Sequence, residues 1–317
     1  MTITRRFLTN WQSILALCII TGYVIVAVGA PWIAPQEDPQ NPTFLRRLPG
    51  VRPTALRIPR PPRPGAPLGT APGGWDIFYA LIWGTRPALR FGLITALLTA
   101  VTGVLIGAFS GYLEGAGRLL MRVTDAFLTF PAIAGIYLFR YTLIPMPALL
   151  STSADASLTF WQVAFQKLQL DPTMLALIAF SWMPYARIIH ANFTTLKHTE
   201  YAMAARVTGA PPLRIIFRHL LPNAIAPAIV LATRDIGGMV LLEATFTFIG
   251  LGSGLPWGTL LVASRDWIIG PGGNPLTYWW VFVPATLTLI VFSVGWNVLG
   301  DGLNTALNPR TRGYRSD

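Results

Sequence analysis

The sequence is poor in charged side chains. Only 12% of its 317 residues are charged, whereas 53% are hydrophobic. Soluble domains usually carry about 25% charged residues, so this balance is that of a membrane protein. Acidic residues are especially few, with 13 Asp and Glu against 24 Lys and Arg, and the formal net charge is +11. A nucleic-acid-binding protein of that charge would be hydrophilic, so basic loops beside apolar spans explain the charge better.

Residues that support chemistry are also scarce. The single cysteine, Cys18, lies in an apolar run; it cannot form an internal disulfide and is most simply a buried small hydrophobe. The two lysines, Lys167 and Lys197, do not stand in a GxxxxGK[ST] phosphate loop, so ATP binding of that kind is excluded. No Ser–His–Asp order or paired carboxylates indicate catalysis. We therefore expect no catalytic, cofactor or metal site; the histidines lack metal-ligand spacing: His190, His198 and His219.

Six apolar runs approach the length of about 20 residues that a membrane-spanning helix needs. They are residues 11–34, 91–113, 126–150, 173–189, 224–250 and 277–300. The first run exceeds the roughly 7–15 residues of a signal-peptide core, so it is better explained as a membrane anchor. Backbone groups in lipid must be satisfied within each segment, which predicts an all-α integral membrane protein with six transmembrane helices.

Two polar segments lie between the predicted spans. The first follows residue 34; its many prolines disfavour a helix, and we expect an extended loop. The second, residues 151–171, has apolar residues at helical spacing, which indicates an amphipathic helix at the membrane surface or an ordinary helix in an external loop.

The arginines predict the orientation. With a cytoplasmic N-terminus, the inner segments carry eleven arginines and lysines, as the positive-inside rule requires: Arg5, Arg6, Arg118, Arg122, Lys197, Arg206, Arg214, Arg218, Arg310, Arg312 and Arg315. The first external loop opposes this assignment with six arginines: Arg46, Arg47, Arg52, Arg57, Arg60 and Arg63. Long loops are partly exempt from the rule, and we expect both termini to be cytoplasmic.

Residues 200–223, EYAMAARVTGAPPLRIIFRHLLPN, form a polar and arginine-rich insert between two apolar runs. About two helical turns are expected from Tyr201 to Val207, with a slim alanine surface that lets another protein approach: Ala202, Ala204 and Ala205. Gly209 suits the left-handed residue at which such a helix ends. This design is a short helix followed by a corner.

A second helix is expected after the corner. Pro211 and Pro212 suit its first turn. An apolar stripe would lie against the spans, and Pro222 would close the helix; the stripe comprises Leu213, Ile216, Phe217, Leu220 and Leu221. Such a segment could transmit a push from a cytoplasmic partner into the membrane, or be a plain structured loop.

Two further groups stand inside predicted spans. Arg234, Asp235 and Glu243 are costly there, which favours a functional role such as lining the solute path or gating; local pairing is the structural alternative. Small residues at four-residue spacing predict close helix packing within the chain: Gly103, Gly107 and Gly111.

YAMAARVTGAPPLRIIFRHLLPN resembles the EAA coupling loop of permease subunits of ABC importers. The chain is most similar to C-type subunits of the dipeptide, oligopeptide and nickel permease family. Further motifs of that family occur in order along most of the chain: WIAPQEDP, PLGTAPGGWDIFYALIWGTRPALRFGL, GYLEGAGRLLMRVTDAFLTFP, EATFTFIGLG, PWGTLL and GDGLNTALNPR.

The resemblance implies a type I ABC importer permease (MetI-like) fold in a bacterial or archaeal cytoplasmic membrane. Residues 1–86 would hold the first helix and external loop, 87–310 the permease core with its coupling loop at about 196–222, and 311–317 a basic tail. The implied partners are a second homologous permease, an external solute-binding protein and cytoplasmic ATPases that bind ATP and Mg. The implied ATPase-coupling residues are Tyr201, Ala204, Ala205, Gly209, Leu221 and Pro222.

Three departures from the family pattern stand out. GTAPGGWD replaces the usual GTD..GRD, so that Trp75 stands where an Arg is usual; Met203 stands where the Glu of EAA would be; and the insert around 139–171 is long. The solute is expected to be a peptide, with nickel or another small solute as the alternative. A stand-alone channel or secondary carrier would transport without ATP.

Overall fold

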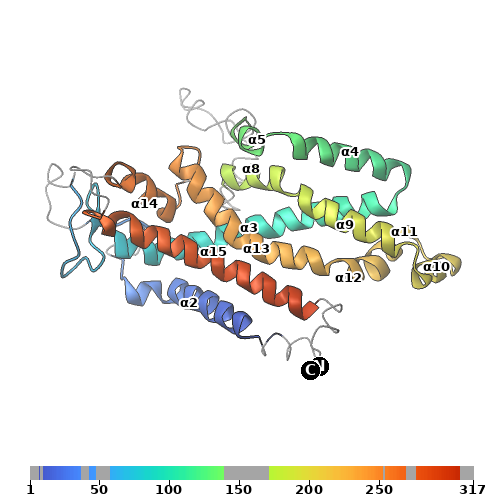
Figure 1. The fold of residues 1–317 in the computed structure, drawn as a ribbon, viewed down its shortest axis with the longest axis horizontal. Helices are drawn as coiled ribbons and strands as arrows, with labels where there is room; N and C mark the ends of the chain where they lie inside the picture. Colours follow the sequence, from blue (N-terminus) through green and yellow to red (C-terminus); the bar gives the residue numbers. More distant parts are fainter. Residues whose placement is uncertain are drawn as a thin grey trace, which may run out of the picture. The chain divides into compact units, whose positions relative to one another are not determined.

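The computed structural model describes residues 7, 10–36, 43–47, 58–138, 171–252, 254–268 and 276–307, and it is mostly helical. Four helical segments within these ranges are long and apolar enough to cross a membrane (Figure 1). They are α2 (Trp11–Ile33), α3 (Ile77–Tyr112), α8 (Pro172–Ser181) joined to α9 (Met183–Leu196), and α15 (Trp279–Leu307). A fifth candidate is the pair Pro212–Ala224 and α13 (Ala226–Phe248), which is bent by 63°. Five of the six predicted runs thus fall on candidate spans.

The remaining predicted span, residues 126–150, lies mostly outside the described residues. Its described part belongs to α4 (Gly115–Thr129) and α5 (Ala132–Leu138), which are separated before Pro131. Proline disfavours the helical conformation of the preceding residue, and Phe130 is accordingly extended, with ψ 137°. The structure therefore supports four or five spans. The surface helix expected over 151–171 also lies outside the described residues, except for Asp171, whose carboxylate accepts the Thr173 N–H at 2.7 Å and caps α8.

The described part of the first loop is folded rather than extended throughout. A short antiparallel hairpin joins β1 (Thr70–Ala71) to β2 (Trp75–Asp76), and its turn uses two glycines of positive φ. The buried Asp76 carboxylate accepts the Tyr79 N–H at 3.2 Å, which caps α3. It also pairs with the Arg46 guanidinium at 2.8 Å. The described part of the loop is therefore not extended throughout, and this partly buried ion pair fastens it to the start of α3.

Chain contacts divide the protein into two compact units. The first comprises Met1–Thr9, Ile94–Thr233 and Gly300–Asp317, and the second Asn10–Leu93 and Arg234–Leu299. Residue 86, the domain border expected from the sequence, lies inside the single helix α3.

The glycine ridge of α3 faces α9 within the first unit. A Cβ added at Gly107 would lie 2.5 Å from the Ala186 carbonyl oxygen, and one at Gly111 would lie 2.5 Å from the Phe193 Cβ. A Cβ at Gly103 would meet the Trp182 carbonyl in the same way. Contacts this short require glycine, so the ridge lets the two helix backbones approach closely.

In the second unit, an arginine supplies a hydrogen bond that a proline removes from α2. Pro31 lies inside α2 and has no N–H to give to the carbonyl four residues back, that of Ala27. Arg86 of α3 supplies that donor: its Nε–H bonds to the Ala27 carbonyl, and one terminal nitrogen donates to Val28 at 3.3 Å. The cost of a proline in an apolar span is thereby offset by a side chain from a neighbouring span.

Candidate functional site

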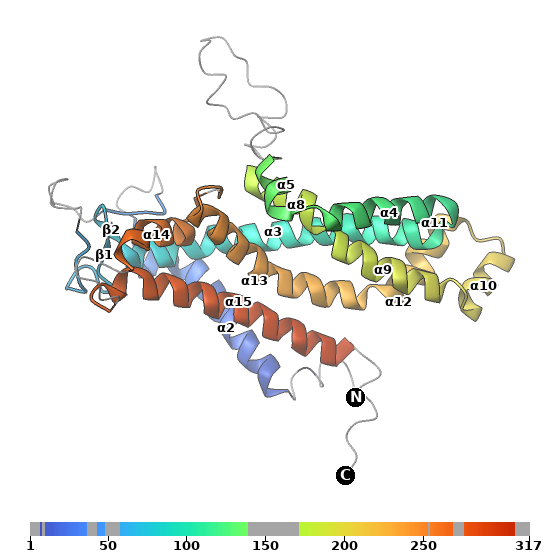
Figure 2. The same ribbon diagram turned by 45° about the horizontal axis from the view of Figure 1, so that its top comes forward.

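The insert between α9 and α13 begins with a short helix. α10 (Glu200–Val207) lies at the end of the first unit, beyond the end of α9 and the start of α12 (Figures 1 and 2). It starts after Thr199, whose backbone is extended. Glu200 in its first turn and Arg206 in its last turn interact favourably with the helix dipole. The expected helix is therefore present.

The corner after α10 is a Schellman motif. Gly209 has φ +76°, and its N–H donates to the Arg206 carbonyl at 3.0 Å. The Ala210 N–H donates to the Ala205 carbonyl at 3.1 Å. These two bonds satisfy carbonyls that the helix end would otherwise leave open, so the corner is held by the backbone itself. The left-handed conformation expected at Gly209 is confirmed.

The second helix of the insert contains a π-helical turn. Pro212 begins it as expected in α11 (Pro212–Arg214), which continues through the π-helical η3 (Ile215–Leu220) into α12 (Leu221–Ala224). The Leu221 N–H bonds to the Ile216 carbonyl, five residues back. Pro222 follows directly and has no N–H of its own, which gives a physical reason for the wider turn. Pro222 lies in the first turn of α12 and does not close the helix, which ends at Ala224.

The π turn changes which side chains face the core. Ile215 and Leu220, five residues apart, are both buried, together with Ile216. Leu213 and Phe217, which regular helical spacing places inside, are 59% and 43% exposed. The predicted stripe is therefore wrong at these two positions, because its spacing assumed an uninterrupted α-helix.

The alanines of α10 do not share one exposed face. Ala202 and Ala205 are buried in a cluster with the isoleucines of η3 and with Phe193 of α9. The Arg206 guanidinium lies 5.6 Å from the centre of the Tyr112 ring, which adds a second contact between α10 and the rest of the chain. Ala204 is exposed. Ala205 is therefore turned towards its own chain, and the slim surface expected of all three alanines reduces to Ala204.

The outer face of α10 is apolar. Tyr201, Met203 and Ala204 are exposed, and Val207 is 89% exposed. We call these four residues the α10 patch. Val207 was not among the residues selected from the sequence, although it lies three positions after Ala204 and so on the same side of a helix. An apolar patch on a polar insert is typical of a protein contact.

The other two selected residues lie at the end of the insert, at the start of α12. Leu221 is half-buried against the same core, whereas Pro222 is exposed. The Asn192 side-chain amide of α9 donates to the Ala224 carbonyl at 3.1 Å, at the bend before α13. This bond satisfies a carbonyl at the end of α12 and links the insert to α9.

The charged residues selected in α13 have different environments. Glu243 is buried; one carboxylate oxygen accepts the Thr247 hydroxyl at 2.6 Å and the Leu255 N–H at 3.3 Å. It therefore holds the turn between α13 and α14 (Pro256–Ser264), which favours an architectural role over gating. Arg234 and Asp235 are half-buried.

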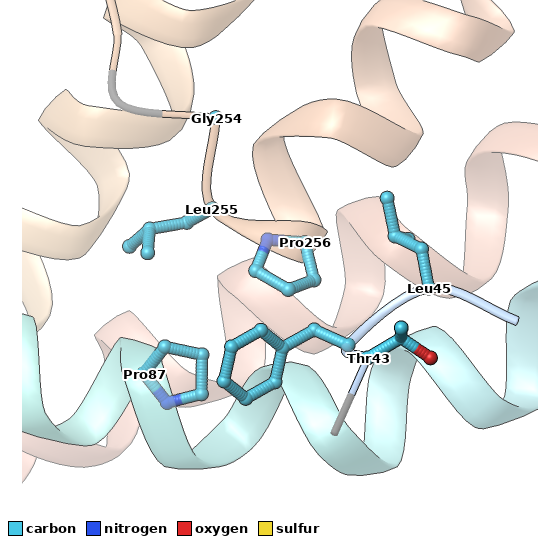
Figure 3. Close-up of a pocket in the computed structure, with 7 residues that line it drawn as sticks. Thr43, Leu45, Pro87, Gly254, Leu255 and Pro256 are labelled. Carbon is cyan, nitrogen blue, oxygen red and sulfur yellow. The ribbon is translucent and has the colours of Figure 1, made fainter. Parts of the chain in front are cut away.

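That turn also borders a cavity of about 470 Å³ in the second unit. Leu255 and Pro256 of the turn and Pro87 of α3 are among its lining residues (Figure 3). The other described lining residues are Thr43, Phe44, Leu45 and Gly254, and none of the described lining side chains is charged. The described lining therefore offers mainly apolar contact.

Comparison with known proteins agrees with this arrangement. Residues 101–313 match the family described as binding-protein-dependent transport system inner membrane component, and residues 2–49 match the N-terminal transmembrane domain of oligopeptide transport permease C. The chain is 30% identical to the di/tripeptide transport system permease protein DppC of Pseudomonas aeruginosa, over 97% of this chain and 91% of that protein. It is 28% identical to the oligopeptide transport system permease protein OppC of Bacillus subtilis, over 97% and 88%.

The first match spans well over half of the chain, and the similarity to these relatives runs along nearly all of it. The family is one of transport components rather than enzymes. The chain belongs to the family of inner-membrane components of binding-protein-dependent transport systems.

Proposed function

We propose that this chain is the permease subunit of an ATP-driven importer of short peptides. It spans the membrane six times with both termini in the cytoplasm, and pairs with a second homologous permease to frame one path. A solute-binding protein delivers the peptide outside, and separate ATPase subunits work inside. The similarity to named peptide permeases supports the peptide as cargo.

One observation carries the coupling role: the α10 patch is apolar, exposed and mounted on a rigid corner. A surface groove of the ATPase would receive Tyr201, Ala204 and Val207. Because Ala202 and Ala205 bind α10 to η3, movement of the patch passes to α12 and, through the bend, to α13. Domain closure of the ATPase can thereby shift the permease between two packings.

Arg234 and Asp235 are further proposed to line the path within α13. Charged groups at such depth are retained where they meet water or solute. Half-burial of both residues is compatible with that role.

The complete complex, reconstituted in proteoliposomes with its binding protein, tests this proposal. Dipeptide import is expected with ATP and absent without it, and Val207→Asp should weaken ATPase association about tenfold or more because a charge would be buried at the contact. Val207→Ala is the matched control and should bind nearly as well as the parent. Import without ATP, or unchanged ATPase binding by Val207→Asp, would contradict the proposal.

A further inference from the structure

α4 has three distinct faces. It lies alongside α9 (Figure 2), and its buried side consists of Gly117 and Thr124 with the half-buried Met121. A second side is apolar and exposed, with Leu119 and Val123 among its members. The third side is polar and exposed along the whole helix, at spacings of four, three and four residues: Arg118, Arg122, Asp125 and Thr129.

α9 presents a matching face beside this stripe. Its exposed positions follow the same helical spacing and carry small, polar or charged side chains: Pro184, Arg187, Ala191 and Thr195. The two faces meet at an ion pair, with the Arg187 Nε 3.6 Å from an Asp125 carboxylate oxygen. Both side chains are open to the outside, at 59% and 55% exposure. We call the two polar faces together the α4–α9 seam.

The ion pair lies deep along both helices. Asp125 follows the start of α4 at Gly115 by ten residues, which is about 15 Å at 1.5 Å per residue. Arg187 precedes the end of the candidate span at Leu196 by nine residues, or about 14 Å. The hydrocarbon core is about 30 Å thick, so Arg187 stands near the middle of its candidate span. Asp125 lies at a similar depth because its carboxylate is 3.6 Å from the Arg187 guanidinium. A short Asp side chain cannot reach the membrane surface from there, as a long basic side chain can.

Lipid is therefore excluded as the neighbour of the seam. Exposed positions of other spans carry the side chains that lipid favours, for example Ile25 and Val28 of α2 and Leu287 of α15. Charged groups within the membrane face water or protein. A contact with another subunit would bury four charged residues, whose desolvation is costly unless each finds a partner, whereas water solvates the whole stripe.

We propose that the α4–α9 seam lines the water-filled path of the importer, and that Asp125 and Arg187 are its binding station for the peptide's termini. The Asp125 carboxylate pairs with the peptide ammonium group, and the Arg187 guanidinium, with its fork of donors, pairs with the terminal carboxylate. In the absence of peptide the two residues pair with each other, so neither charge stands alone in the membrane. The role of the station rests on the proposed peptide-import function.

Cysteine accessibility in the reconstituted complex tests this assignment. The single cysteine is first removed as Cys18→Ala, and Asp125→Cys, Thr129→Cys and Arg187→Cys are then made one at a time. Leu119→Cys and Val123→Cys, exposed on the apolar face of the same helix, are the matched controls. The probe is a positively charged, membrane-impermeant methanethiosulfonate, added with and without a saturating dipeptide.

Seam cysteines are expected to react roughly tenfold or more faster than the controls, because the reactive thiolate forms in contact with water. Saturating dipeptide should slow the reaction at positions 125 and 187 more than at 129. Equal and slow reaction on both faces would overturn the proposal. So would loss of complex assembly confined to the seam variants, since it would make the seam a contact between subunits.

The parent complex carrying Cys18→Ala separates the two proposals. Its failure to import dipeptide with ATP, or import without ATP, would refute the proposed function while leaving the measured water access of the seam intact. Normal ATP-driven import together with an unreactive seam would refute this inference alone.

Discussion

At Gly209 the backbone turns through φ +76°, yet nothing lies within 4 Å of the place where a Cβ would stand. Conformation rather than space therefore dictates the residue. A β-branched side chain in the left-handed region costs on the order of 1–2 kcal/mol, whereas asparagine enters it more readily. That difference provides a pair of variants of similar size with opposite expected effects.

Gly209→Val should leave the complex assembled but abolish most of the stimulation of ATPase activity by the binding protein, because the corner would reopen and α10 would lose its fixed angle. Gly209→Asn should retain most of that stimulation. The measurement is ATP hydrolysis by the reconstituted complex with and without loaded binding protein. Full stimulation in Gly209→Val would show that the corner need not be rigid.

At the scale of helices, the structure pairs a proline in one span with an arginine in another. Arg86 donates to the carbonyl that Pro31 leaves without a donor in α2. An unsatisfied buried carbonyl costs about 1–3 kcal/mol. Replacing Pro31 should therefore reduce the stability that is lost when Arg86 is replaced.

Arg86→Leu is expected to lower the thermal stability of the detergent-solubilised complex, and Pro31→Ala added to it should restore part of the loss. Pro31→Ala gives position 31 the N–H that a regular helix directs to Ala27. Thermal unfolding of the single and double variants measures the effect. A double variant no more stable than Arg86→Leu alone would refute the pairing.

Much of the helical architecture could be predicted from composition and local signals. Long apolar runs located the four or five candidate spans, and Gly209 and Pro212 located the corner and the helix after it. The π turn could not be predicted, because an N–H that bonds five residues back leaves no mark in the spacing of Leu213 and Phe217. Arg86 was missed for a related reason: its partner lies on another helix, 59 positions away in the sequence.

For the whole molecule, the main conflict in the predicted orientation was the arginine-rich first loop. Two of its arginines have structural roles: Arg46 pairs with Asp76, and Arg47 lies 4.5 Å from the centre of the Trp75 ring. The departure from the family pattern at Trp75 thus supplies a partner for a neighbouring cation. The fold accounts for the presence of these two arginines in the loop. They are therefore weaker evidence against a cytoplasmic N-terminus than arginines without structural contacts would be.

Labelling from the two sides of the membrane tests this orientation. In a Cys18→Ala background, Val207→Cys should react with an impermeant thiol reagent applied from the cytoplasm, and Ile58→Cys with reagent applied from outside. Both side chains are well exposed in this chain, and labelling is carried out on the permease without its ATPase subunits, which would cover position 207. The reverse pattern would place α10 outside and remove the basis for coupling to an ATPase.

The methyl groups of Ala202 and Ala205 set the height at which α10 rests on η3. A larger side chain at either position would push α10 away from η3. Second-site revertants of such a change should then arise by shrinkage among the buried isoleucines beneath, Ile215 and Ile216, and a genetic selection for restored growth on peptides would reveal them.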